Sequence, residues 1–338
     1  MNRVNRRTAL GIGTAATAGV VLGTATPAMA APSSGRGLET PSRARADEVA
    51  AIYQREKTKA GGNWYAYLSV ANGTNPAPLP AVREHPDTVV EAYSVNKIAV
   101  ATAVLDKVDR GLLSLDQRVE VTEGIVVPGG DGIFSLDGAY PSLVTLGHVL
   151  AALLTVSDDT AVRLCGLVCP AAELNQILVG KGFPKTQVEP VANPNRFYLG
   201  TSTARETHDL LQALVRGTLL STGSTSFLLN QLRAPIAFTD GIRRTMSSAE
   251  RARIATKAGW FADARHEAGL IFDPAGRPVL TYVLFADGQA GSDNFGSTHP
   301  AVQARAAMGP AFLEAVDGLT SLGVPARRPK MYQPSNGG

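Results

Sequence analysis

Residues 94–110 read Ser94-Val95-Asn96-Lys97 followed by IAVATAVLDKVDR, and Gly111 comes next. The apolar, alanine-rich run predicts a helix from Val95 to Arg110, which Gly111 would end. If Ser94 opens this helix, Lys97 lies one turn later on the same face. A buried amine there could accept the serine proton, and the backbone N–H groups at a helix N-terminus stabilise developing negative charge. Ser94 is therefore a candidate nucleophile with Lys97 beside it.

A second polar element, Ser157-Asp158-Asp159, stands between apolar helices predicted over residues 146–155 and 159–168. A hydroxyl at this junction could relay a proton to a leaving group. Ser157 could equally cap the helix that begins at Asp158, and the two roles are compatible.

The third element is Lys257-Ala258-Gly259, on a strand predicted to start near Ile254 and followed by Trp260. A lysine facing a cleft would attract a substrate carboxylate, and Gly259 would let a substrate backbone approach closely. A lysine on a strand can also simply be solvated.

In this order the three elements resemble the SxxK, SDN and KTG motifs of penicillin-binding proteins and class A β-lactamases. Glu189-Pro190-Val191-Ala192-Asn193 resembles the ExxxN segment of the class A branch. The resemblance implies that Ser94 forms an acyl-enzyme, with Lys97 or Glu189 as base, and that Glu189 and Asn193 hold the hydrolytic water. It further implies that Ser157, contacted by Lys257, protonates the leaving nitrogen.

The same resemblance suggests binding residues around the nucleophile. The backbone N–H groups of Ser94 and Trp260 would hold the oxyanion, and Asp159 would face the substrate's acylamide group. Arg243, fourteen residues before Lys257, stands where some class A enzymes support the substrate carboxylate.

Three departures from the family pattern point to altered substrate recognition. Asp159 replaces an asparagine, so an amide donor becomes an acceptor. Ala258 replaces a hydroxyl residue, and losing a hydrogen bond to a charged group costs roughly 1.5–3 kcal/mol. Pro184, Gln187 and Gly200 stand where an ion pair usually braces the loop, which suggests that the loop carrying Glu189 is organised differently.

The order of predicted elements indicates an α+β fold: an antiparallel sheet flanked by helices, with an inserted all-α subdomain. The resemblance implies that this fold is of the β-lactamase/transpeptidase type. We expect a signal peptide over 1–30, a flexible linker over 31–46, a catalytic domain over 47–325 and a disordered tail over 326–338. Within the domain, an α/β part would comprise about 47–85 and 225–320, and the all-α part about 86–224.

Residues 1–30 contain Arg6-Arg7, a weakly apolar run and Ala28-Met29-Ala30, which together predict twin-arginine export rather than Sec export or a membrane anchor. The protein would then be extracellular or periplasmic, without stable membrane insertion. Charged residues make up 18% of the chain and the net charge is +3, with no basic block that would favour nucleic acid. We expect a monomer acting on a small molecule.

The remaining reactive side chains do not suggest a cofactor. The only cysteines are Cys165 and Cys169, which could form a disulfide across a helix end or remain two small buried side chains. The five histidines lack metal-binding spacing, so neither metal nor cofactor is expected. Two alternatives to β-lactam hydrolysis stay open: a D,D-peptidase or esterase, and a catalytically weak penicillin-binding homologue.

Overall fold

A five-stranded antiparallel sheet forms the centre of the fold, in a computed structural model that describes residues 41–73 and 75–322. The strands run in the order β2-β1-β10-β9-β8, and each is antiparallel to its neighbours. Their bounds are β1 (Asn63–Asn72), β2 (Asn75–Glu84), β8 (Ile254–Phe261), β9 (Ala264–Phe272) and β10 (Pro278–Asp287). Both ends of the described chain contribute strands, so the predicted α+β class is confirmed.

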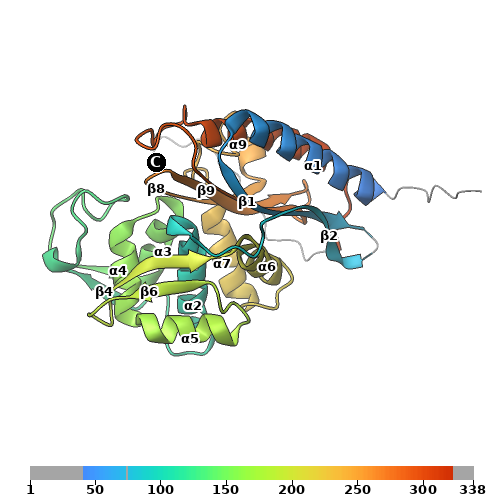
Figure 1. The fold of residues 1–338 in the computed structure, drawn as a ribbon. Coiled ribbons are helices and arrows are strands. Elements are labelled where there is room, and N and C mark those ends of the chain that lie inside the picture. The colour runs from blue at the N-terminus through green and yellow to red at the C-terminus, as the bar shows by residue number, and fades with distance from the viewer. Residues whose placement is uncertain (1–40, 74, 323–338) are drawn as a thin grey trace, which may run out of the picture. The chain divides into compact units, whose positions relative to one another are not determined.

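Helices cover both faces of this sheet. Helices α1 (Pro41–Ala60) and α9 (Pro300–Ala315) lie together on one face, and the inserted helices lie on the other (Figure 1). Side chains alternate along β1, because successive residues of a strand point to opposite faces. Trp64 and Leu68 therefore pack in the core under α1 and α9, whereas Tyr67 belongs to the core of the inserted helices.

The inserted segment holds most of the remaining elements, and it is not all-α as predicted. Its helices are η1 (Tyr93–Asn96), α2 (Lys97–Asp109), η2 (Glu123–Ile125), α3 (Leu146–Thr155), α4 (Asp159–Val168), α5 (Ala171–Gly180), α6 (Ala204–Val215) and α7 (Thr222–Leu232). Two small antiparallel sheets accompany them: β3 (Val90–Glu91), β7 (Phe197–Ser202) and β6 (Gln187–Pro190), and a pair β4 (Arg118–Val121) and β5 (Ser142–Thr145). Of these strands, β4 alternates exposed polar and buried apolar residues (RVEV), a pattern that the sequence analysis overlooked. A short α8 (Ser248–Arg251) precedes β8.

The predicted linker over 31–46 is wrong for its last six residues, since α1 already includes Pro41. Ala46 is buried in this helix, and the pairs Arg43–Asp47 and Arg45–Glu48 lie at helical spacing. The predictions for 1–30, 31–40 and 326–338 fall outside the described residues.

Strand β2 was not predicted, because its sequence NPAPLPAVRE contains three prolines. Pro76, Pro78 and Pro80 lie at alternate positions of an edge strand. Since successive backbone N–H groups point to opposite edges, prolines spaced two apart leave intact the donors of the edge that pairs with β1.

Cys165 and Cys169 are both buried and both free thiols. Cys169 follows the last residue of α4, and its backbone N–H still donates to the carbonyl of Cys165. Burial raises the pKa of both thiols. Of the two alternatives from the sequence, the structure has the buried reduced pair.

Within the described residues, no single helix has the length and apolarity to cross a membrane. Helices α4 and α5 pass this test only when taken together, and they are bent by 83° relative to each other.

His266 on β9 connects the sheet to the segment before Ser94. Its Nε2 lies 3.0 Å from the carbonyl oxygen of Glu91, and its Nδ1 accepts from the backbone N–H of Ala286 at 3.1 Å. This pattern requires the neutral ring with the proton on Nε2. Burial lowers the pKa of His266 to about 4.

We therefore expect the protein to lose stability below neutral pH. An unfolded chain binds a proton at its histidines near pH 6.5, whereas folded His266 binds one only near pH 4. The contribution of neutral His266 to the free energy of unfolding is complete above pH 6.5. It falls by roughly 3 kcal/mol as the pH drops toward 4. Urea unfolding at several pH values should give a smaller pH dependence for His266→Gln than for the wild type. Equal dependences would contradict this assignment.

Candidate active site

Ser94 lies on the 3-10 turn η1, which continues directly into α2, so Lys97 follows one turn later as predicted. Three contacts hold this turn against β7. The backbone N–H of Ala92 donates to the Gly200 carbonyl at 2.9 Å, and Asn96 Nδ2 donates to the carbonyls of Leu199 and Thr201 at 2.7 and 2.9 Å. These bonds fix the position of the candidate nucleophile relative to the rim of the site.

The turn also lies directly against strand β8. A Cβ at Gly259 would fall 2.8 Å from the backbone nitrogen of Ser94 and 3.0 Å from the carbonyl oxygen of Ala92. Gly259 was predicted to admit a substrate backbone. In the structure, the backbone that lies against Gly259 is instead the segment that carries Ser94.

Three predicted residues, Lys97, Ser157 and Lys257, form a buried hydrogen-bonded chain. Ser157 Oγ accepts from Lys97 Nζ at 3.1 Å and from Lys257 Nζ at 3.0 Å. Lys97 Nζ also donates to the Ser157 carbonyl, and Lys257 Nζ to the Ala258 carbonyl at 2.8 Å. Ser157 has φ of +58°, a conformation that is unusual for a residue with a side chain. Two buried amines therefore converge on one hydroxyl.

The environment lowers the pKa of both amines. Burial is the main cause for Lys97, opposed by the nearby carboxylate of Asp159. For Lys257 burial acts together with the positive charge of Lys97. Two close ammonium groups repel each other, which favours the loss of a proton from one of them. An amine with a lowered pKa can serve as a general base.

Asp158 and Asp159 have different structural roles. Asp158, rather than Ser157, caps α4, with Oδ1 accepting from the Ala161 N–H at 2.8 Å. Its Oδ2 accepts from the N–H groups of Ile133 and Phe134. Asp159 Oδ1 pairs with Lys97 Nζ at 2.8 Å, and its Oδ2 accepts from the N–H of Asp131 at 3.0 Å. The acid that replaces the family's asparagine is thus engaged with the candidate base.

A cavity of about 610 Å³ opens in front of Ser94. Ser94, Asp159, Glu189 and Trp260 are the predicted site residues that line it. Ser157 and Lys257 line a smaller adjoining cavity of about 190 Å³ that also touches Trp260. Seven predicted residues therefore either line one of the two cavities or belong to the lysine–serine chain.

The structure does not bring Glu189 and Asn193 together in the cavity. Glu189 is an exposed residue of β6, opposite Tyr198 of β7. Asn193 does not line the cavity; its side chain accepts from the Asn195 N–H at 3.0 Å and its carbonyl from the Arg196 N–H at 2.9 Å. The predicted water-binding pair is incomplete, because Asn193 closes a turn of its own loop.

Arg243 is not a substrate-binding residue in this structure, contrary to the prediction. Its side chain is completely buried and donates to the carbonyl oxygens of Leu232, Ala234, Ala237 and Ile254. It therefore joins the end of α7 to the start of β8. Spacing from Lys257 along the chain could not reveal that the side chain points inward.

Asp131 was missed by sequence reasoning. It lines the cavity beside Asp159, and both burial and the charge of Asp159 raise its pKa. The surrounding Gly129-Gly130-Asp131-Gly132 was the available signal, because clustered glycines allow a loop to approach another segment closely.

Aromatic side chains on the cavity rim were also missed. Tyr198, Phe261 and Phe295 all line the cavity while their exposed fractions are 67%, 65% and 55%. Tyr93, which has φ of +48°, packs against Phe261 with ring centroids 5.7 Å apart. Exposed aromatic groups around a polar centre are typical of ligand-binding sites.

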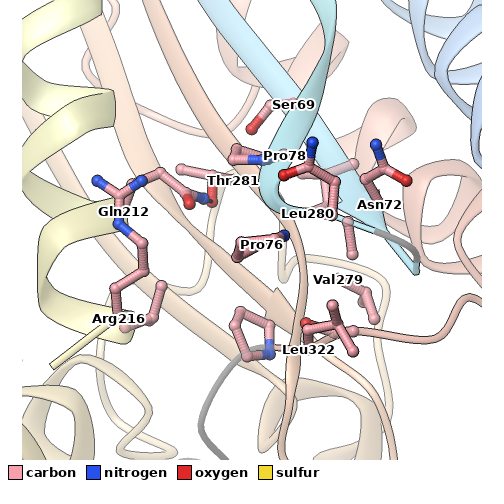
Figure 2. A pocket seen from close by; sticks show the side chains of 15 residues that line it. Ser69, Asn72, Pro76, Pro78, Gln212, Arg216, Val279, Leu280, Thr281 and Leu322 are labelled. Carbon is pink, nitrogen blue, oxygen red and sulfur yellow. Dashed lines mark hydrogen bonds between the residues drawn. The ribbon is translucent and has the colours of Figure 1, made fainter.

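A second serine forms a hydrogen-bonded chain elsewhere. Ser69 Oγ lies 2.7 Å from His208 Nε2, and His208 Nδ1 lies 2.9 Å from Asp209 Oδ1. Figure 2 shows Ser69 beside Gln212 and Thr281 at a cavity of only about 40 Å³. Such a volume holds about one water molecule. Ser69 is itself buried, so this chain satisfies polar groups of the core and has no room for a substrate carbonyl.

No cluster of three or more histidine, cysteine or acidic side chains suited to a metal ion occurs within residues 41–73 and 75–322.

A serine at a helix start, a lysine one turn on, and a second serine shared by two buried amines define a serine enzyme of the β-lactamase or penicillin-binding type. The model of the β-lactamase enzyme family matches residues 44–316. The chain belongs to this family.

Solved structures agree with the fold. A β-lactamase from Sphaerobacter thermophilus superimposes with a TM-score of 0.67 at 21% identity, covering 81% of this chain and 98% of its own. A β-lactamase from Xanthomonas campestris superimposes with a TM-score of 0.66 at 19% identity, covering 80% of this chain and 98% of its own. A mutant of PBP-A, as an acyl-enzyme complex with penicillin G, gives 0.62 at 21% identity, covering 82% and 100%. A comparison with curated proteins finds no significant match.

Proposed function

We propose that the protein opens β-lactam rings through an acyl-enzyme on Ser94, in the manner of a class A β-lactamase. The observation that carries this proposal is Ser157 Oγ, which accepts hydrogen bonds from both Lys97 and Lys257. This arrangement supplies a base on one side of Ser157 and a proton source on the other.

In the proposed reaction Ser94 Oγ attacks the ring carbonyl carbon and its proton passes to neutral Lys97 Nζ. The backbone N–H groups of Ser94 and Trp260 stabilise the oxyanion, a role supported by the presence of both residues in the cavity wall. When the carbon–nitrogen bond breaks, the ring nitrogen takes the proton of Ser157 Oγ–H. The lysine amines return a proton to Ser157.

Hydrolysis of the acyl-enzyme requires an activated water, and Glu189, one of the acids in the cavity wall, would take this role. Asn193, however, is engaged in its own loop. This observation supports a second candidate function, a penicillin-binding enzyme of the peptidase type whose acyl-enzyme is long-lived.

Nitrocefin turnover distinguishes the two functions. A β-lactamase gives continuous Ser94-dependent hydrolysis over many equivalents. A penicillin-binding enzyme gives a burst of one equivalent followed by a slow phase. Absence of both, with folded protein, would reject ring opening and direct attention to esters and D-amino peptides.

We also propose that the protein is exported by the twin-arginine route and acts outside the cytoplasm on a small molecule. The support is Arg6-Arg7 and Ala28-Met29-Ala30 in the sequence. Replacing both arginines by lysine should retain the protein, uncleaved, inside the cell. Unchanged release would reject this route.

A further inference from the structure

A second cavity, of about 400 Å³, adjoins the Ser94 cavity along α4 and β7. Asp159, Tyr198 and Leu199 line both cavities, so the two share one wall. The second cavity shares no lining residue with the cavity that contains Ser157 and Lys257. It therefore extends from the Asp159 side of the site.

Two guanidinium groups line this second cavity, which we name the arginine cavity after Arg163 and Arg196. Arg163 lies one turn after Asp159 on α4, and Arg196 directly precedes β7. Arg163 Nη1 donates to the carbonyls of Ile125 and Val126 at 3.2 and 2.9 Å. Arg196 Nη2 donates to the carbonyl of Gly124 at 3.0 Å. The short segment 124–126 thus orients both guanidinium groups.

The two guanidinium groups carry positive charge that no protein carboxylate neutralises at contact distance. No ion pair of Arg163 or Arg196 occurs within the part of the chain that the structure describes. Burial, together with the positive charge of Arg196, lowers the pKa of Arg163, and the more distant charge of Asp159 opposes this shift. A guanidinium has five N–H donors in a planar fork, so each retains donors beyond those used on the 124–126 turn.

The other walls of the arginine cavity are apolar, formed by Val127, Val162, Val191 and Phe197. A ligand group that fits such a compartment has an apolar chain and an anionic end. A carboxylate suits paired guanidinium groups best, because its two oxygens accept bidentate hydrogen bonds.

We propose that the arginine cavity is a subsite for a terminal carboxylate on the acyl part of the substrate. The inference rests on the proposed function, in which the departing nitrogen faces Ser157. The acyl part then extends away from Ser157 and Lys257, past Asp159 and Tyr198. Both carboxylate oxygens of Asp159 are engaged on its own side of the shared wall, one with Lys97 Nζ and the other with the Asp131 N–H.

Two penicillins that differ at one group test this subsite. One is 6-aminopenicillanic acid acylated with adipic acid, which ends in a carboxylate, and the other is its terminal amide. The wild type should acylate at Ser94 at least tenfold more efficiently with the carboxylate, measured as kcat/KM or the acylation rate constant.

In the double variant Arg163→Gln/Arg196→Gln, the ratio of the acylation efficiency with the carboxylate to that with the amide should fall to about one. The ratio compares two substrates on the same protein, so partial loss of folded enzyme does not alter it. Arg118→Gln, at an exposed position of β4, removes one positive charge elsewhere and should retain the preference. A wild-type ratio near one, or an unchanged ratio in the double variant, would overturn the proposal.

Binding without chemistry separates this inference from the proposed function. Calorimetry on Ser94→Ala should give tighter binding of the carboxylate compound than of the amide, and the two arginine replacements should remove that difference. If neither compound acylates the wild type, ring opening fails as the function, while the binding difference still decides the subsite. Equal affinities would reject it.

Discussion

Replacing Lys97 by glutamine is expected to slow acylation of Ser94 at neutral pH by about 10²- to 10⁴-fold. The buried amine contacts Ser157 and Asp159 and has a lowered pKa, and the proposed function assigns it the removal of the Ser94 proton. Wild-type acylation should rise with pH as Lys97 loses its proton, at a pH below its ordinary pKa of 10.5. The Gln variant should lose this rise. Stopped-flow acylation across pH measures both effects.

Lys107 offers a matched control on the same helix. It is nearly buried and donates to Glu173 and to the Val168 carbonyl, away from the cavity. Lys107→Gln should lower stability but leave the acylation rate and its pH profile unchanged. If Lys97→Gln behaves like Lys107→Gln, the base is another group, and Glu189 acting through water becomes the alternative.

Adding one methyl group at Gly259 is expected to have the second largest effect. The new Cβ would lie 2.8 Å from the Ser94 nitrogen and 2.9 Å from the Val95 nitrogen, closer than real Cβ contacts allow. The backbone of η1 or β8 must move, which displaces the nucleophile and its N–H group. Since displacements near 1 Å can reduce rates 100-fold, Gly259→Ala should lower the acylation rate by at least about that factor.

Gly223→Ala is the corresponding control, because a Cβ at this position of α7 makes only an ordinary contact with Ser221 at 3.8 Å. It should be acylated at the wild-type rate. Circular dichroism establishes that both variants are folded. Unchanged acylation in folded Gly259→Ala would mean that the Ser94 turn tolerates displacement, contrary to its tight packing.

The residues that the structure places where sequence reasoning expected them depend on local spacing. Lys97 follows Ser94 by one helical turn, and Asp159 begins a helix, so short-range geometry determines how they are presented. The apolar strands and helices of the core were predicted for the same reason. The strand of Lys257 was predicted from its apolar neighbours, although its contact with Ser157 is a property of the whole fold.

The residues that sequence reasoning misplaced depend on long-range packing. Nothing local indicates that Arg243 turns inward to four carbonyl groups, or that Asn193 closes its own turn. Asp131 reaches the site through a loop held by Asp158, a contact between distant segments. The edge strand β2 was missed because proline normally opposes a strand, and only its place at the sheet edge makes three prolines acceptable.

Intact-mass spectrometry of the protein mixed with benzylpenicillin, quenched in acid over milliseconds to minutes, tests the central claim most directly. The account predicts a covalent adduct of one penicillin, mapped by peptide sequencing to Ser94 and absent from Ser94→Ala. Its lifetime separates rapid hydrolysis from stable trapping. An adduct on another residue, or one that persists in Ser94→Ala, would contradict the account.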